Sequence, residues 1–76
     1  MTEFFILLSD MGAVNKLYNA AEKRDYDIEL HASNHIVPAK SLVGIFSFDL
    51  TKPIKVVSPK ENDLELKREL FNYICK

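Results

Sequence analysis

The sequence predicts one small α+β domain of two layers, with helices packed on one face of a four-stranded sheet. The chain has 76 residues, a length that suits a single hydrophobic core. Short apolar runs with the two-residue period of strands alternate with runs near the 3.6-residue period of helices. The predicted order is strand, helix, strand, strand, helix, strand, helix, over residues 1–76.

The composition excludes several classes of function. Hydrophobic residues make up 47% and charged residues 28%, which is ordinary for a soluble globular domain. The net charge is −1 and no basic block is present, so we expect no nucleic-acid partner. The apolar run from Phe4 to Leu8 is too short to cross a membrane. Because the single cysteine, Cys75, cannot form an internal disulfide, we expect a cytoplasmic protein.

The first half of the chain predicts a strand, a helix and a hairpin. Residues 3–9 form a continuous apolar run with the length of a buried strand. Residues 13–23 carry apolar side chains at helical spacing, as in a short amphipathic helix. Residues 26–32 alternate between apolar and polar, which predicts a half-buried strand. Ser33-Asn34 then has the composition of a turn, and a second strand follows over residues 35–37.

The second half opens with a short helix and a fourth strand. Ser41 is placed to cap that helix by accepting a free backbone amide of its first turn. Gly44 lies in the helix interior, where glycine costs about 1 kcal/mol relative to alanine, so we expect either a close backbone approach or fraying of the helix there. Apolar residues from Ile54 to Val57 predict the fourth strand.

A final helix is predicted from Pro59 to about Cys75. Ser58 would cap it, Pro59 would be its first residue and Glu61 would complete a capping box. The inward-facing side chains are expected to be Leu66, Leu70, Tyr73 and Ile74, with Leu64 and Phe71 widening the apolar stripe.

Residues 20–47 carry a resemblance to a known family. The closest pieces are Ala20-Ala21, Asp27-Ile28-Glu29-Leu30 and Lys40-Ser41-Leu42-Val43-Gly44. In their order and ungapped spacing they resemble the bacterial histidine-containing phosphocarrier, HPr. The resemblance implies the HPr fold, an open-faced β-sandwich with a four-stranded antiparallel sheet and three helices on one face.

The family's phosphate-accepting histidine is missing from this chain. In HPr a Gly-(Ile/Leu)-His-Ala-Arg-Pro-Ala motif joins the first strand to the first helix, where the imidazole is the nucleophile and the arginine clamps the phosphate. The ungapped alignment puts Asp10 at the histidine, Gly12 at the arginine and Ala13 at the proline. No histidine or arginine lies between Met1 and Lys23. We therefore expect a non-catalytic protein, not an enzyme, without cofactor or metal.

Three polar residues, Asp10, His31 and His35, have either a chemical or a structural role. Asp10 is either an acyl-phosphate acceptor or, as we expect, the cap of the first helix. His31 and His35 are the only histidines. They share a face of the hairpin or lie on opposite faces, depending on its register, and we expect solvent-facing residues rather than metal ligands.

The resemblance also indicates a regulatory site on the second helix. Many Gram-positive HPr proteins have a serine there that an ATP-dependent kinase phosphorylates, and Ser41 matches its position. The alternative for Ser41 is a plain helix cap. Leu42, Val43 and Phe46 match the apolar patch that the family exposes to its partners, and the alternative is that some of them are core.

The combination is similar to that of the catabolite-repression HPr-like proteins, regulators that keep the serine and lack the histidine. This chain departs further, since it also lacks the arginine and shortens the turn from Asp49 to Pro53. The leading hypothesis is a binding or regulatory module for a protein partner: a phosphotransferase-system component, a kinase or a regulator. Alternatives are an atypical phosphocarrier using Asp10 or a hairpin histidine, and an assembly protein using Phe4 and Phe5 for strand exchange. Either a monomer or a dimer fits, with no membrane partner.

Overall fold

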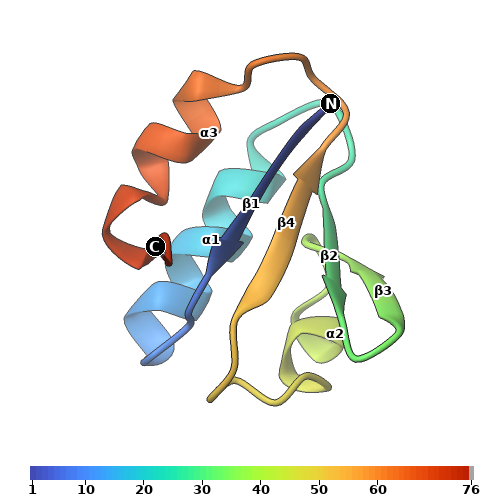
Figure 1. Ribbon diagram of the computed structural model, residues 1–76, viewed down its shortest axis with the longest axis vertical. Coiled ribbons are helices and arrows are strands. Elements are labelled where there is room, and N and C mark those ends of the chain that lie inside the picture. Colours follow the sequence, from blue (N-terminus) through green and yellow to red (C-terminus); the bar gives the residue numbers. More distant parts are fainter. Residues whose placement is uncertain (76) are drawn as a thin grey trace.

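The computed structural model describes residues 1–75, and it has the predicted α+β architecture (Figure 1). The elements in chain order are β1 (Thr2–Ile6), α1 (Met11–Glu22), β2 (Glu29–Ala32), β3 (His35–Pro38), α2 (Leu42–Phe46), β4 (Ile54–Ser58), α3 (Leu64–Glu69) and the 3₁₀ turn η1 (Phe71–Tyr73). The four strands form one sheet in the order β1-β4-β2-β3, and every neighbouring pair is antiparallel. The predicted fold class is confirmed. Within residues 1–75, no helix has the length and apolarity needed to cross a membrane.

The strand β1 is shorter and less buried than its apolar sequence predicts. It covers Thr2–Ile6 instead of residues 3–9, and its side chains alternate between buried and exposed. Phe4 and Ile6 point into the core, whereas Phe5 lies on the open face of the sheet and is 50% exposed. The run Phe4–Leu8 therefore does not have two buried sides, because helices cover only one face of this sheet.

The hairpin between β2 and β3 has the predicted turn but a shorter first strand. Regular pairing begins at Glu29, not at Tyr26. Ser33 and Asn34 both have positive φ, 51° and 64°, which is the geometry of a type I′ turn. Because this turn fixes the pairing of Ala32 with His35, it sets the register of the whole hairpin.

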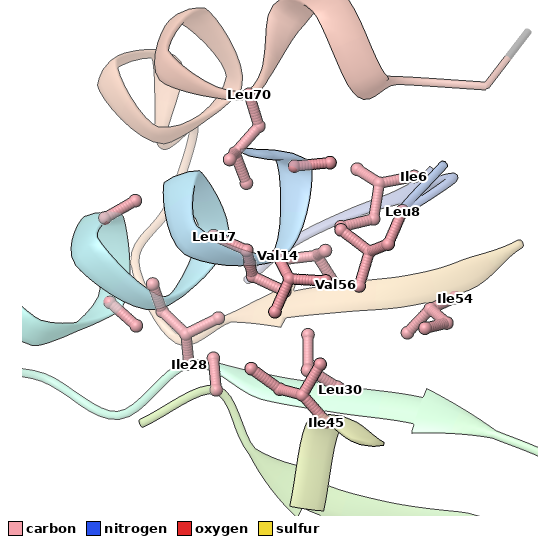
Figure 2. Packing of buried hydrophobic residues seen from close by; sticks show 14 of the residues in the cluster. Ile6, Leu8, Val14, Leu17, Ile28, Leu30, Ile45, Ile54, Val56 and Leu70 are labelled. Carbon is pink, nitrogen blue, oxygen red and sulfur yellow. The ribbon is translucent and has the colours of Figure 1, made fainter. Parts of the chain in front are cut away.

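The core lies between the sheet and the helical layer (Figure 2). Val14 and Leu17 of α1 point toward Leu30 of β2 and Val56 of β4, and all four are almost fully buried. The other fully buried large side chains are Ile6, Ile28, Ile45, Ile54, Leu66 and Leu70. Leu66 and Leu70 thus face inward as predicted.

The helix α3 begins five residues later than the sequence pattern predicts. Its N-cap is Asp63, whose carboxylate accepts the Leu66 amide at 3.2 Å. Ser58 is instead the buried last residue of β4, and its hydroxyl donates to Asp63 at 2.8 Å. The capping-box prediction for Ser58, Pro59 and Glu61 is wrong, because burial of Asp63 beside Ser58 outweighs the local pattern. Glu61 pairs with the N-terminal ammonium of Met1 at 2.8 Å.

The C-terminal segment leaves the helix and pairs with β1. Tyr73 accepts the Leu7 amide at 2.9 Å, and Cys75 donates its amide to the Phe5 carbonyl at 2.8 Å. These bonds require an extended chain after η1, so the helix cannot continue to Cys75. Leu64 and Phe71, predicted to widen the buried stripe, are instead 54% and 70% exposed.

Candidate functional site

The start of α1 is closed by a carboxylate. Asp10 has an extended backbone, and its Oδ1 accepts the amide of Ala13 at 2.8 Å. Its carbonyl also accepts from Ala13 and from Val14, at 3.1 and 3.2 Å. The predicted cap is therefore present in the structure.

Asp10 and Ala13 act together at this helix start. A proline at position 13, as in the HPr motif, has no amide hydrogen to donate. Ala13 supplies one, and Asp10 takes it up. The carboxylate thereby places a fixed negative charge where a helix N-terminus would otherwise attract a phosphate.

Gly12 leaves the outside of this helix start open. A Cβ at Gly12 would lie 3.2 Å from Oδ1 of Asp10. Apart from this carboxyl group, it would meet no other residue within 4 Å. Next to it, Met11 is an exposed apolar side chain in the first turn. The position that the alignment gives to the family's arginine thus carries no cation here.

The two histidines lie on opposite faces of the hairpin. His31 pairs with Ile36 and His35 with Ala32, and paired residues share a face of the sheet. His31 Nε2 lies 3.0 Å from Oε1 of Glu29. Over residues 1–75, no three side chains of His, Cys, Asp or Glu gather in a group that could hold a metal ion.

The second candidate site is the exposed side of α2, which we call the α2 surface: Leu42, Val43 and Phe46. All three side chains are solvent-exposed, and Val43 is 84% exposed. Ile45, the remaining large apolar residue of this helix, is fully buried and holds α2 to the core. The structure therefore brings the three predicted partner-binding residues together on one exposed patch.

Ser41 and Gly44 fix α2 in place beside this surface. Ser41 is the N-cap, and its Oγ accepts the Gly44 amide at 3.0 Å. A Cβ at Gly44 would lie 3.1 Å from Cβ of Val37 on β3. The expected close approach at Gly44 is thus present, and it seats the helix against the hairpin.

A buried polar network that the sequence analysis missed joins one end of the sheet, where β4 ends and β2 begins, to α3. The carboxylate of Asp63, on a residue 1% exposed, accepts from the hydroxyls of Tyr26 and Ser58. Arg24 donates to the Tyr26 hydroxyl at 3.2 Å and to Glu69 at 2.8 Å. A shallow cleft of about 290 Å³ lies over the network.

Hydrogen bonding sets the acidity of this network. Burial alone would raise the pKa of Asp63, but hydrogen bonds from Tyr26, Ser58 and the Leu66 amide outweigh it and lower the pKa below 3.8. Burial and the bond to Asp63 raise the pKa of Tyr26 above 10.0. Both groups stay in their ordinary charge states at neutral pH. With no orphaned buried polar side-chain atom among residues 1–75, the network has a structural role.

The signal for Asp63 was available in the sequence. Asp is a preferred N-cap and Asp63 directly precedes an apolar residue, but the stronger pattern at Ser58 concealed it. A second feature was also missed: Leu64 and Phe71, seven residues apart with Lys67 and Arg68 between them, form an exposed row. Their helical spacing is the same for a buried and for an exposed stripe.

Comparison with known proteins identifies the fold. No protein-family model matches the sequence, and no curated protein matches it. A solved structure, the crystal structure of HPr-C-His from Thermoanaerobacter tengcongensis, aligns with a TM-score of 0.72 over 95% of this chain and 89% of that chain. The chain has the HPr fold. At 22% sequence identity, this likeness concerns the arrangement of the HPr fold and not its chemistry.

Proposed function

We propose that this chain is a non-catalytic module on the HPr fold that binds a protein partner through its α2 surface. The observation that carries the proposal is the cap of α1. The carboxylate of Asp10 accepts a hydrogen bond from the Ala13 amide at the N-terminus of α1. Its negative charge would repel a phosphate at that helix end. No histidine or arginine stands nearby in the sequence to take its place.

The α2 surface supports docking because its side chains lie outside the buried core. Val43 is 84% exposed, while the fully buried Ile45 anchors the helix to the core. Grouped apolar side chains on a small monomer are typical of interaction sites. The partner class that the resemblance implies is a component, kinase or regulator of the sugar phosphotransferase system, in the cytoplasm.

Ser41 would supply the switch for this docking. Its hydroxyl lies at the border of the α2 surface and is partly exposed. A phosphate on Ser41 would add a charge close to −2 beside Leu42 and Val43. Such a charge changes an apolar docking surface into an anionic one, so phosphorylation would select between partners.

The first experiment is an intact-mass measurement after two incubations. One mixture holds phosphoenolpyruvate and the general kinase of the sugar phosphotransferase system, and the other holds ATP and the serine kinase that modifies HPr. We expect a phosphoryl adduct with ATP only, absent in Ser41→Ala. An adduct with phosphoenolpyruvate would contradict the proposal and point to an atypical phosphocarrier, with Asp10→Asn and His31→Ala locating the acceptor.

Docking is tested in the same ATP mixture with a matched pair of variants. Val43→Glu places a charge on the α2 surface, whereas Ile36→Glu places one at another exposed apolar residue, on β3 of the sheet. We expect slower adduct formation only for Val43→Glu. Equal rates for both variants would remove the α2 surface as the docking site. Without any adduct, the serine switch is excluded.

A further inference from the structure

A groove is lined by Phe4 of β1 and by side chains of α3 and the segment after it. Figure 1 shows that α3 lies far from α2 in the molecule. It has a volume of about 470 Å³. Its apolar lining comes from the buried Phe4, the partly buried Ile74 and the exposed Leu64 and Phe71. The two exposed side chains, Leu64 and Phe71, belong to α3 and the 3₁₀ turn that follows it. Exposed apolar side chains grouped at one groove indicate a binding site better than the same side chains scattered singly.

The edge of β1 beside this groove is only partly covered. The C-terminal segment takes the Phe5 carbonyl and the Leu7 amide, which therefore point away from β4. Since backbone groups of a strand alternate in direction, the amide and carbonyl of Glu3 point to this same side. Among residues 1–75, β1 pairs with β4 along one side. Its other side has only the bridge between Ile6 and Ile74. The first half of the edge is thus open to a further strand.

The rim of the groove carries two cations from α3. Lys67 and Arg68 line it, and within residues 1–75 neither of them forms an ion pair. The one acidic side chain on this stretch of β1, Glu3, points to the other face, 3.8 Å from Lys55. The groove therefore offers an apolar floor, two cations that form no ion pair within residues 1–75, and an open strand edge.

We propose that this groove binds an extended segment of a partner protein by strand addition to β1. The segment would pair its backbone with Glu3 and place an apolar side chain between Phe4, Leu64 and Phe71. In a strand, residues two apart share a face, so acidic side chains two positions before and after the apolar one would reach toward Lys67 and Arg68. The partner is an acidic, apolar-centred peptide, and this second docking surface is independent of the α2 surface.

The test is a titration of the ¹⁵N-labelled protein with two synthetic peptides at low salt, because salt screens exposed charges. The first peptide is acetyl-Thr-Asp-Thr-Leu-Thr-Glu-Thr-amide. The second has lysine in place of both acidic residues. We expect saturable shifts with the acidic peptide, centred on the amides of Glu3 and Phe5 and on α3, and slower hydrogen exchange at Glu3. The lysine peptide should bind at least about fivefold more weakly, from loss and reversal of two exposed charge contacts.

Three variants separate this site from the α2 surface. Arg68→Glu should weaken the acidic peptide and strengthen the lysine peptide, and Phe71→Asp should abolish saturable binding. Both side chains are exposed, so both variants should keep the remaining amide spectrum. Val43→Glu should bind the acidic peptide as the unaltered protein does. Equal binding of both peptides, shifts centred on α2, or no saturation up to about 5 mM would overturn the proposal.

Discussion

At the scale of single residues, the two glycines occupy helices for different reasons. Gly44 faces β3, where an added Cβ would lie 3.1 Å from both Val37 and the Ser41 hydroxyl. Gly12 faces solvent, where an added Cβ would meet only the Asp10 carboxyl group, with its Oδ1 at 3.2 Å. Helix propensity favours alanine at both positions, but packing opposes it at only one of them.

We expect Gly44→Ala to lower the free energy of unfolding by about 1 kcal/mol, because α2 must move away from the hairpin to fit the methyl group. Gly12→Ala should leave it unchanged or raise it by about 0.5 kcal/mol. Urea unfolding of both variants measures the two values side by side. A gain in stability for Gly44→Ala would show that the contact with Val37 relaxes without cost.

The buried carboxylate of Asp63 should make stability depend on pH in the acid range. Its pKa is lowered in the folded protein relative to the ordinary 3.8, since Tyr26 and Ser58 donate to the charged form. The resulting stabilisation is complete above the unfolded-state pKa of 3.8. It disappears as the pH falls through the lower pKa of the folded state.

Asp63→Asn removes this titration and the N-cap charge together. We expect a loss of at least about 2 kcal/mol at pH 7, because an NH₂ group in place of Oδ2 leaves the hydroxyls of Tyr26 and Ser58 without an acceptor. Below pH 3.8 the difference from the unaltered protein should shrink. The control is Asp25→Asn, a change at an exposed side chain, which should leave the free energy of unfolding at pH 7 within about 0.5 kcal/mol of the unaltered protein. A constant gap between the two curves from pH 7 to acid would contradict the assignment.

The residues that the sequence placed correctly are those whose role is local. Asp10 and Ser41 each bond an amide three residues ahead, so their caps follow from the neighbouring residues alone. Asp63 is also a local cap, but it is selected over Ser58 by contacts with Tyr26 and Thr2, which lie far away in the sequence. A local pattern does not contain those contacts.

At the scale of elements, the turn between β2 and β3 carries strain that its sequence does not relieve. Ser33 and Asn34 both have positive φ, which costs a side-chain-bearing residue about 1 kcal/mol and suits Asn-Gly best. The double substitution Ser33→Asn, Asn34→Gly should raise the unfolding free energy by about 1 kcal/mol. Thermal and urea unfolding check this, with Asn34→Ala as the opposite, destabilising change. No gain would indicate that this turn does not have the type I′ geometry.

The elements themselves were predictable, and their limits were not. The alternation in residues 26–32 is present, but only Glu29–Ala32 pairs with a neighbouring strand. Tyr26 instead bonds Arg24 and Asp63 through its hydroxyl. The last helix ends at Glu69 because residues 73–75 pair with β1 from the far end of the chain. Both limits depend on tertiary contacts, and helical spacing alone could not say that Leu64 and Phe71 face solvent.

At the scale of the whole molecule, a chain of this length has little apolar area to spare. Domains near this size bury only about 60–65% of the surface of the unfolded chain. This one nevertheless leaves apolar side chains exposed at both the α2 surface and the groove beside α3. Because they add little to the core, we infer that they serve binding, and their removal should cost little stability.

The double variant Val43→Glu, Phe71→Glu tests this division of roles. The two side chains are 84% and 70% exposed, so we expect the unfolding free energy to stay within about 0.5 kcal/mol of the unaltered protein. The matched control Ile45→Ala, a fully buried residue of the same α2 helix, should cost about 2–5 kcal/mol. Urea unfolding with equal denaturant slopes for all three proteins gives the comparison. A loss near that of Ile45→Ala would place the exposed side chains in the folding core and remove the basis for both proposed docking surfaces.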